Sequence, residues 1–346
     1  MSHHPRARRL SLAVLFALST LLGPALAGAK QPPPCRTVSG MVFLPNPVAT
    51  SGDIFLQDNR DSDSAVLTAE RVAVQLVGLD GSGYLRGTWA NVVSETGDPA
   101  FETDCSYDYT RSDDRFEQVM AYYWVTESQL YLRSLGFGTG RFPAVNADQQ
   151  RVRINQWGID NSFATTHPVD EMRFGKGGVD DAEDGDVILH ELGHQIHFSQ
   201  SATFFSSAEA GAISEGFGDY WAFTVSKAVA GPQFDEACIA KWDATSYDFN
   251  ASNGICLRRI DSDLTYPDDL VGQVHADGRI WSRALYDLHH AIGQTRADTA
   301  ILVAQFDWTG TTMSDLAQRI VDAVQQLYGN GPRNQALDVF EDRGIL

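Results

Sequence analysis

The sequence DVILHELGHQIHF, residues 186–198, places two histidines four positions apart in an apolar run. If this run is a helix, residues four apart share one face, so His190 and His194 can bind the same metal ion. Glu191 is offset from His190 by about 100° on the 3.6-residue period. It can therefore take a proton from a water molecule beside the metal instead of binding the metal. The pattern predicts a zinc helix over about residues 186–199.

The residues before this run favour the start of a helix. Residues 180–186 read DDAEDGD, and acidic side chains stabilise a helix N-terminus through capping and the helix dipole. The HExxH pattern is nevertheless short enough to occur by chance in unrelated proteins. A catalytic zinc site also requires a third protein ligand and an open position for water.

A third ligand is available in GAISEGFGDYWAF, residues 211–223. Most of this stretch is small or apolar, so two acidic residues in it are expected to have a buried role. Glu215 follows His194 by 21 positions and is the candidate ligand. Asp219 lies four residues later on the same helical face and can accept the spare N–H of a ligand histidine.

A third motif is GQVHADGRIWSRALYDL, residues 272–288, in which His275 precedes a helical pattern. A zinc hydrolase benefits from a hydrogen-bond donor that faces the oxyanion formed during the reaction. His275 is the candidate for that donor.

The first 27 residues have the pattern of a secretory signal peptide. Arg6, Arg8 and Arg9 form a basic region, residues 11–23 are apolar, and a small-x-small cleavage site ends at Ala27. The apolar run is short for a spanning helix, and no later stretch is long and apolar enough to cross a membrane. We therefore expect a protein that is secreted, extracellular or periplasmic, without stable membrane insertion after signal removal.

The chain is strongly acidic. Its 346 residues carry a formal net charge of −19, which becomes −22 when the three arginines of the signal peptide are removed. Nucleic acid is therefore not an expected partner, because phosphate binding requires a basic face. Strong acidity suits a soluble secreted protein and allows calcium binding.

All four cysteines lie after the signal peptide, and an even number in an exported chain indicates disulfides. Their spacing fits no CxxC metal pattern. Three pairings are possible. We favour Cys35–Cys105 with Cys238–Cys256, because each bond closes a loop within one region of the chain.

The chain changes from β-rich to helix-rich near residue 113. Residues 28–112 contain β-branched runs such as RVAVQLVGL separated by turn residues. After residue 113, apolar residues recur at helical spacing in several segments. We expect an α+β fold with a small N-terminal β domain at 28–112. In the main domain, 113–346, a β-rich lobe and a helical lobe (about 205–346) flank the zinc helix.

DVILHELGHQIHF, GAISEGFGDYWAF and VHADGRIW, in this order and spacing, resemble the gluzincin metallopeptidases of the thermolysin and fungalysin type. The helix pattern at 116–137 and the C-terminal segment 334–346 are also similar to these enzymes. The resemblance covers roughly 113–346 and implies a thermolysin/fungalysin-like metallopeptidase domain there. It does not extend to the β-rich region before it.

The resemblance implies a role for each motif residue. The zinc ligands would be His190, His194 and Glu215. Glu191 would be the general base and then carry the proton to the leaving amine. His275 would stabilise the oxyanion and Asp219 would orient a ligand histidine.

Three further roles follow from the resemblance alone. Asn161, on an edge strand before the zinc helix, would bind the substrate backbone. Arg259, preferred over Arg258, would bind a substrate carbonyl. Asp186 occupies a place where thermolysin-like enzymes bind calcium, so the resemblance allows Ca²⁺ beside the catalytic Zn²⁺. The tyrosine that thermolysin-like enzymes carry ahead of the third ligand is absent, so either another donor replaces it or His275 acts alone.

The hypothesis is a secreted zinc endopeptidase that hydrolyses proteins or peptides. The alternative from another class is an exported, non-catalytic binding or adhesion protein that keeps zinc for structure. That alternative would be favoured by a missing Glu191 or by a fourth protein ligand. The sequence contains Glu191 and suggests no fourth ligand.

Overall fold

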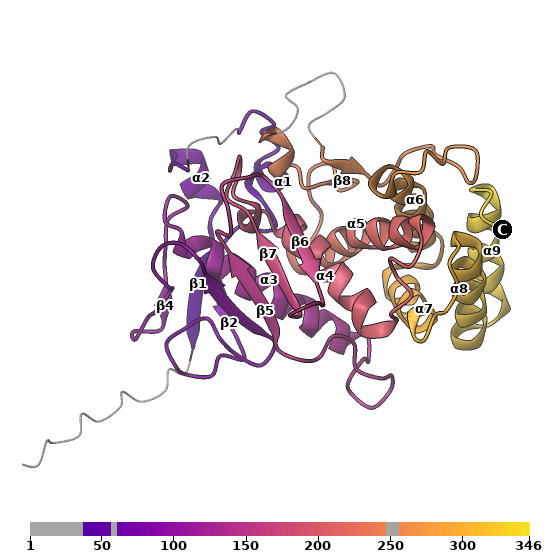
Figure 1. The fold of residues 1–346 in the computed structure, drawn as a ribbon, viewed down its shortest axis with the longest axis horizontal. Coiled ribbons are helices and arrows are strands. Elements are labelled where there is room, and N and C mark those ends of the chain that lie inside the picture. Colours follow the sequence, from indigo (N-terminus) through magenta and orange to yellow (C-terminus); the bar gives the residue numbers. More distant parts are fainter. Residues whose placement is uncertain (1–36, 57–60, 247–255) are drawn as a thin grey trace, which may run out of the picture. The chain divides into compact units, whose positions relative to one another are not determined.

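The computed structural model describes residues 37–56, 61–246 and 256–346. The predicted signal peptide and Cys35 lie outside these residues. Residues 34–346 belong to one folded unit, and Figure 1 shows the order of its elements. None of the helices described has the length and apolar character needed to cross a membrane.

Most strands come before residue 185, and most of the long helices begin at or after it. The strands are β1 (Val38–Val42), β2 (Val72–Leu76), β3 (Ala90–Ser94), β4 (Ser106–Tyr107), β5 (Gln150–Ile154), β6 (Ser162–Thr165), β7 (Glu171–Phe174), β8 (Cys238–Ile239) and β9 (Arg258–Arg259). The helices are α1 (Pro47–Ser51), α2 (Ala65–Glu70), α3 (Arg115–Ser134), α4 (Gly185–Gln200), α5 (Ala208–Ala230), α6 (Val274–Ile292), α7 (Gln294–Gln305), α8 (Met313–Tyr328) and α9 (Asn330–Asp342), with 3₁₀ turns η1 (Asp181–Glu183) and η2 (Asp243–Ser246).

The strands among the described residues form three sheets. One has the order β2-β1-β4, with β1 antiparallel to β2 and parallel to β4. The larger sheet has the order β3-β5-β7-β6, and β6 is its antiparallel edge strand. β8 and β9 pair separately. Side chains of β5 alternate between buried and half-buried, as expected for a strand with one face against a helix.

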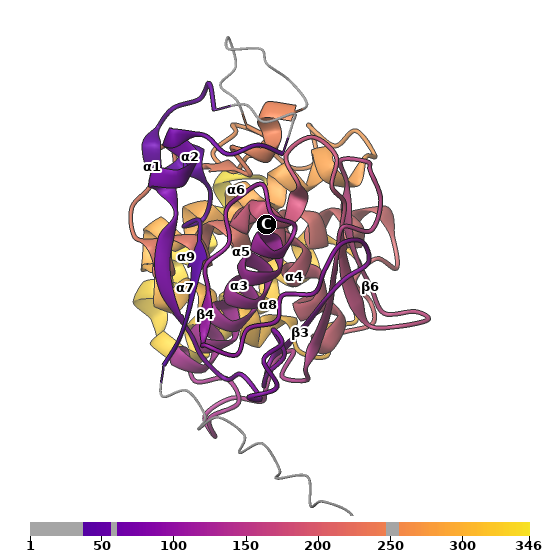
Figure 2. The same ribbon diagram turned by 90° about the vertical axis from the view of Figure 1, so that its left-hand side faces the viewer.

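The larger sheet is continuous across the predicted domain boundary at residue 112, because β3 precedes that residue and pairs with β5. Helix α3 contacts β1 of the first sheet and both β3 and β5 of the second, and Figure 2 shows it between the two sheets. Val42, Val92 and Trp124 belong to one hydrophobic core. The chain before residue 112 thus shares both sheet and core with the chain that follows.

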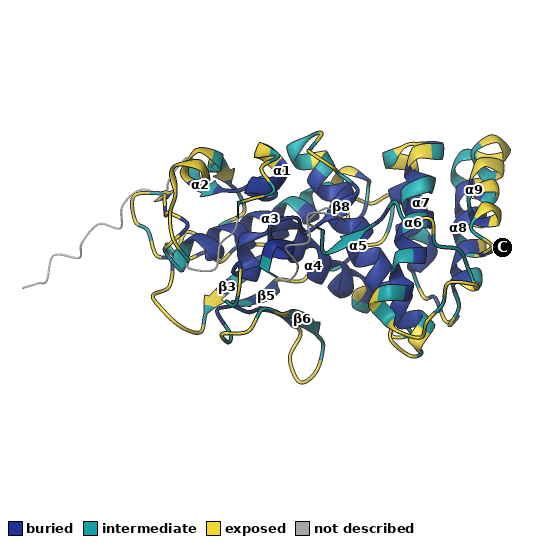
Figure 3. Ribbon diagram, turned by 90° about the horizontal axis from the view of Figure 1, so that it is seen from above, coloured by how far each residue is buried: buried dark blue, intermediate teal, exposed yellow. Residues whose placement is uncertain are grey.

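Helices α4 and α5 pack against each other at the centre of this unit, where Figure 3 shows mostly buried residues. Asp184 caps the start of α4, where its carboxylate accepts from the Asp186 amide, and Ser207 caps the start of α5, where its hydroxyl accepts from the Ala210 amide. The two helices touch through glycines. A Cβ added to Gly193 would lie 2.8 Å from the Cα of Gly218.

The remaining helices complete the second lobe. α6 packs on α5, α9 on α6, and α8 on both α7 and α9. The predicted α+β fold, with a β-rich lobe and a helical lobe on either side of the zinc helix, is confirmed. The helix predicted at about 186–199 is α4.

Candidate active site

Three predicted zinc ligands meet between α4 and α5. His190, His194 and Glu215 are buried, and one ligand atom from each lies within 4.8 Å of the others. His190 Nε2 is 3.3 Å from one oxygen of Glu215, and His194 Nε2 is 3.6 Å from the other. The i, i+4 spacing on α4 places both imidazoles on the face that α5 covers.

The outer nitrogen of each ligand histidine has its own partner. His190 Nδ1 is 2.9 Å from Asp219 Oδ1, the carboxylate that the sequence predicts for this role. His194 Nδ1 is 3.0 Å from Ser214 Oγ. With the Nδ1 protons directed at these acceptors, the Nε2 lone pairs of both histidines face Glu215, which is the tautomer that a metal ligand needs.

The charges at this position suit a zinc ion. Burial and Arg258 oppose protonation of His190, but its hydrogen bonds to Asp219 and Glu215 prevail and raise its pKa to about 9. The carboxylates therefore attract positive charge to this point. Two imidazole nitrogens and one carboxylate are also a ligand set of catalytic zinc, with a fourth position left for water. The residues present fit zinc.

Glu191 lies beside the ligands and lines a cavity together with His190. It is 6% exposed, and its Oε2 has no hydrogen-bond partner among the described residues. Burial raises the pKa of Glu191 to about 7, against the opposing charge of His190. A carboxylate with a pKa near neutrality and a free oxygen is suited to exchange protons with water.

His275 lies in the first turn of α6, with its Nε2 3.4 Å from Glu215 Oε2. Its side chain is about half exposed and lines the cavity. The side-chain amide nitrogen of Gln273, Nε2, lies 2.9 Å from His275 Nδ1. Because an amide nitrogen only donates, the neutral imidazole carries its proton on Nε2, the atom that faces the ligands.

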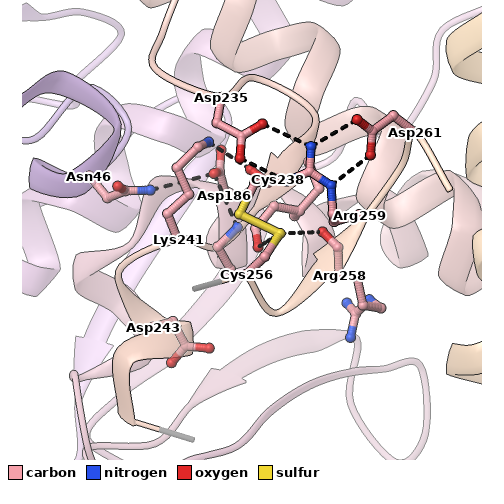
Figure 4. The surroundings of a disulfide bond; sticks show 12 residues. Asn46, Asp186, Asp235, Cys238, Lys241, Asp243, Cys256, Arg258, Arg259 and Asp261 are labelled. Atoms are coloured by element: carbon pink, nitrogen blue, oxygen red, sulfur yellow. Dashed lines mark hydrogen bonds and ion pairs between the residues drawn. A yellow bond between two sulfur atoms is a disulfide. The ribbon is translucent and has the colours of Figure 1, made fainter. Parts of the chain in front are cut away.

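The arginine at this site is Arg258 and not the predicted Arg259. Arg258 lines the cavity and pairs with Asp219 at 2.7 Å. Arg259 instead forms ion pairs with Asp235 and Asp261. The two residues form β9, where successive side chains point to opposite faces. Figure 4 shows their guanidinium groups pointing in opposite directions.

Asn161 lies where the sequence places it, at the start of the edge strand β6. It is exposed and lines the same cavity as His190 and Glu191, which has a volume of about 210 Å³. Its backbone oxygen accepts a hydrogen bond from Gly175, but none of the described strands pairs with the outer edge of β6. An extended peptide can pair with an edge of this kind.

The surroundings of Asp186 do not fit the calcium ion that the resemblance allows there. Its carboxylate accepts hydrogen bonds from Ser226 Oγ at 2.8 Å and from the Ala240 amide at 3.2 Å. Burial raises the pKa of Asp186, and the positive charge of Lys241 opposes that rise. Asp184 lies nearby and shares the Asn46 amide group with Asp186. Calcium, however, requires six to eight oxygen ligands, and hydrogen-bond donors and the Lys241 charge already act on Asp186.

The sequence does not predict the hydrogen bonds that Ser214 makes to two histidines of α4. Its hydroxyl lies 3.0 Å from both His194 Nδ1 and His197 Nδ1. His197 is fully buried between the rings of Phe204 and Phe217, and burial lowers its pKa well below the usual range. A neutral His197 can therefore accept from Ser214 while Ser214 accepts from His194. The only hint of this role in the sequence is that Ser214 directly precedes the ligand Glu215.

One predicted disulfide, Cys238–Cys256, is confirmed. It joins the segments of β8 and β9, and each cysteine precedes a residue that lines the cavity, Ile239 or Leu257. The second predicted bond involves Cys35, which is outside the described residues.

Comparison with known proteins agrees with this geometry. No curated protein matches the chain. The precursor of protealysin, a metalloproteinase from Serratia proteamaculans, has a similar fold, with a TM-score of 0.52 and 16% sequence identity over 66% of this chain and 79% of that one. The family model of the fungalysin metallopeptidases (M36) matches residues 110–331, well over half of the chain. The chain therefore belongs to the fungalysin (M36) family and is a zinc metalloendopeptidase.

Proposed function

We propose that this protein is a secreted endopeptidase in which Glu191 activates the water that attacks the peptide bond. The observation that carries the proposal is the arrangement around α4. His190, His194 and Glu215 present their ligand atoms within 4.8 Å of one another, and Glu191 has an unpartnered oxygen on the cavity that His190 also lines. A purely structural zinc site would be closed by a fourth protein ligand, and the zinc-ligand group of the described residues has three.

Zinc held by these ligands would polarise the scissile carbonyl and make a water molecule more acidic. Glu191 would take the proton of the attacking water and later deliver it to the leaving nitrogen. Glu191 can make both transfers because it is buried beside the ligands with one oxygen free on the cavity. His275 would donate its Nε2 proton to the oxyanion of the tetrahedral intermediate.

The substrate backbone would bind across the same cavity. Arg258 would donate to a substrate carbonyl, because its guanidinium faces the cavity and Asp219 fixes its position through two nitrogens. Asn161 and the free edge of β6 would pair with the extended peptide. Protein and peptide substrates are expected, without a nucleic-acid partner.

Casein hydrolysis by residues 28–346, compared with the Glu191→Gln variant at equal zinc content, tests this function. The parent should cleave casein, and the variant should lose activity by at least about 10²-fold while binding the same amount of zinc. Equal cleavage by both proteins would contradict the proposed role of Glu191. Zinc binding without cleavage in either protein would favour the non-catalytic alternative.

Secretion is proposed from the leader sequence at residues 1–27. When the full chain is expressed in a host with a general export pathway, the exported protein should begin at Gly28. N-terminal sequencing checks this. Protein that stays in the cytoplasm with an intact Met1 would contradict it.

A further inference from the structure

Three carboxylates that the proposed reaction does not use converge beside the active-site cavity. Asp160, Asp181 and Asp243, here called the acidic group, each bring one oxygen within 4.8 Å of the others. They come from the loop before β6, from η1 and from η2. Asp181 and Asp243 line the same cavity as His190 and Glu191. Two of the three members of the acidic group therefore border the space where substrate would bind.

A second observation that points to a ligand is a buried oxygen of Asp243 that has no hydrogen-bond donor among the described residues. The residue is 3% exposed, and its Oδ1 accepts no hydrogen bond from the residues that the structure describes. Its carboxyl group is hydrogen-bonded to Asp160, another member of the acidic group. Burial raises the pKa of Asp243 well above its usual range, and the charges of Asp181 and Asp160 raise it further. A buried oxygen in such surroundings would be stabilised by a cation.

The walls of the cavity are suited to the aliphatic part of a long side chain. Val187, Ile239 and Leu257 line it together with the acidic residues. Its volume is about 210 Å³, and a cavity of roughly 150 Å³ already admits a benzene ring. Lysine and arginine combine an apolar stem with a charged end, so they match a cavity that has both apolar walls and carboxylates.

We infer that the acidic group binds the ammonium or guanidinium group of a lysine or arginine side chain next to the scissile bond. This inference rests on the proposed function and narrows its substrate class. Three carboxylates can accept the three N–H donors of an ammonium group or the planar fork of a guanidinium group. A calcium ion could also bind carboxylate oxygens, but the apolar walls of the cavity match the stem of a lysine or arginine side chain.

Cleavage of a peptide library derived from a whole proteome, read by mass spectrometry, tests the inference. The wild-type protein should cleave sites with lysine or arginine at one of the two positions that flank the scissile bond at least about tenfold more often than matched apolar sites. Asp243→Asn and Asp160→Asn should each reduce this preference. Asp160 is only partly buried, so its variant serves if the Asp243 variant fails to fold.

Asp338→Asn is the matched control, because Asp338 is an exposed residue of α9. It should keep the wild-type preference. Absence of a lysine or arginine preference in the wild-type protein would overturn the inference while leaving the proposed endopeptidase intact. A preference that persists in both the Asp243 and Asp160 variants would overturn it as well.

A binding measurement keeps the test independent of cleavage. The Glu191→Gln protein should bind the peptide acetyl-Ala-Ala-Lys-Ala-Ala-amide at least about tenfold more tightly than its norleucine analogue, which lacks only the ammonium group. Equal affinities would overturn the inference even if no substrate is cleaved. Calcium binding by the acidic group would also overturn the inference. In that case about 1 mM calcium would raise the Tm of the wild type but not of Asp243→Asn, and it would remove the lysine preference.

Discussion

Adjacent residues of a strand can have different roles because their side chains point to opposite faces. Arg258 and Arg259 form β9, and only Arg258 faces the ligand histidines and the cavity. Its guanidinium is held by Asp219, the residue that also orients His190. Asp219 thus connects the proposed substrate-binding arginine with a zinc ligand.

Exchanging each arginine for lysine should separate their roles. Arg258→Lys keeps the charge beside Asp219 but loses the forked donor, so kcat/KM for a peptide should fall by roughly 10-fold to 100-fold. Arg259→Lys should change it by less than about twofold, because the partly exposed pairs of Arg259 with Asp235 and Asp261 contribute little. Steady-state kinetics at equal zinc content measures both. Similar losses in the two variants would contradict the assignment of Arg258 to the substrate.

The sequence predicts residues whose geometry is local and misses those that depend on distant packing. The i, i+4 histidines and Glu191 follow from the helical period alone. The choice between Arg258 and Arg259 depends on the register of β9, which is fixed by its pairing with β8 and by the Cys238–Cys256 bond. A one-residue shift of a strand reverses every side chain, and no local pattern in the sequence decides that shift.

At the scale of elements, the site depends on how closely α5 approaches α4. Gly193, at a variable position of the HExxH pattern, lies against Gly218 of α5. A Cβ on Gly218 would in turn lie 2.7 Å from His190 Nδ1. Both glycines therefore let α5 bring Glu215 to the histidines. The sequence predicts both helices, but it does not predict this contact, because the two glycines are 25 positions apart.

Gly193→Ala should separate the two helices and weaken both the fold and the zinc site. Alanine favours a helix over glycine by about 1 kcal/mol, but the new Cβ would meet backbone at 2.8 Å. We expect a net loss of about 1–3 kcal/mol in the free energy of unfolding, and weaker zinc binding because Glu215 lies on α5. Urea unfolding and competition with a zinc chelator measure the two effects.

Gly331→Ala is the control for that prediction. Gly331 lies in α9, and a Cβ there would have no neighbour within 4 Å. This variant should keep wild-type zinc affinity and be as stable as the wild type or slightly more so. If Gly193→Ala behaved in the same way, the close approach of α4 and α5 would not control the position of Glu215.

At the scale of the whole unit, buried polar contacts join segments that the sequence separates widely. Asp298 of α7 accepts hydrogen bonds from Tyr131 of α3 and from Tyr220 and Thr224 of α5. The α+β order of elements could be predicted from periodicity. A carboxylate that connects three helices could not, because Asp298 lies in a helical pattern that gives no sign of its partners.

Asp298 should make stability depend on pH in a defined direction. Burial raises its pKa to about 6 from 3.8, although the three hydroxyl donors lower it. Between these values the folded protein binds more protons than the unfolded chain, so the free energy of unfolding falls as pH rises from about 4 to 6. The expected contribution is about 3 kcal/mol, fully present below pH 4 and lost above pH 6.

Comparison with Asp298→Asn isolates this effect. Urea unfolding of both proteins with a zinc chelator present, between about pH 4 and pH 8, should show the wild type losing about 3 kcal/mol more than the variant over that range. His289, near Tyr220, has its pKa lowered to about 3 by burial and acts in the opposite direction. Because His289 is present in both proteins, its effect cancels in the difference. Parallel pH profiles would mean that Asp298 is already ionised in the fold at pH 4, with its hydrogen-bond donors outweighing burial.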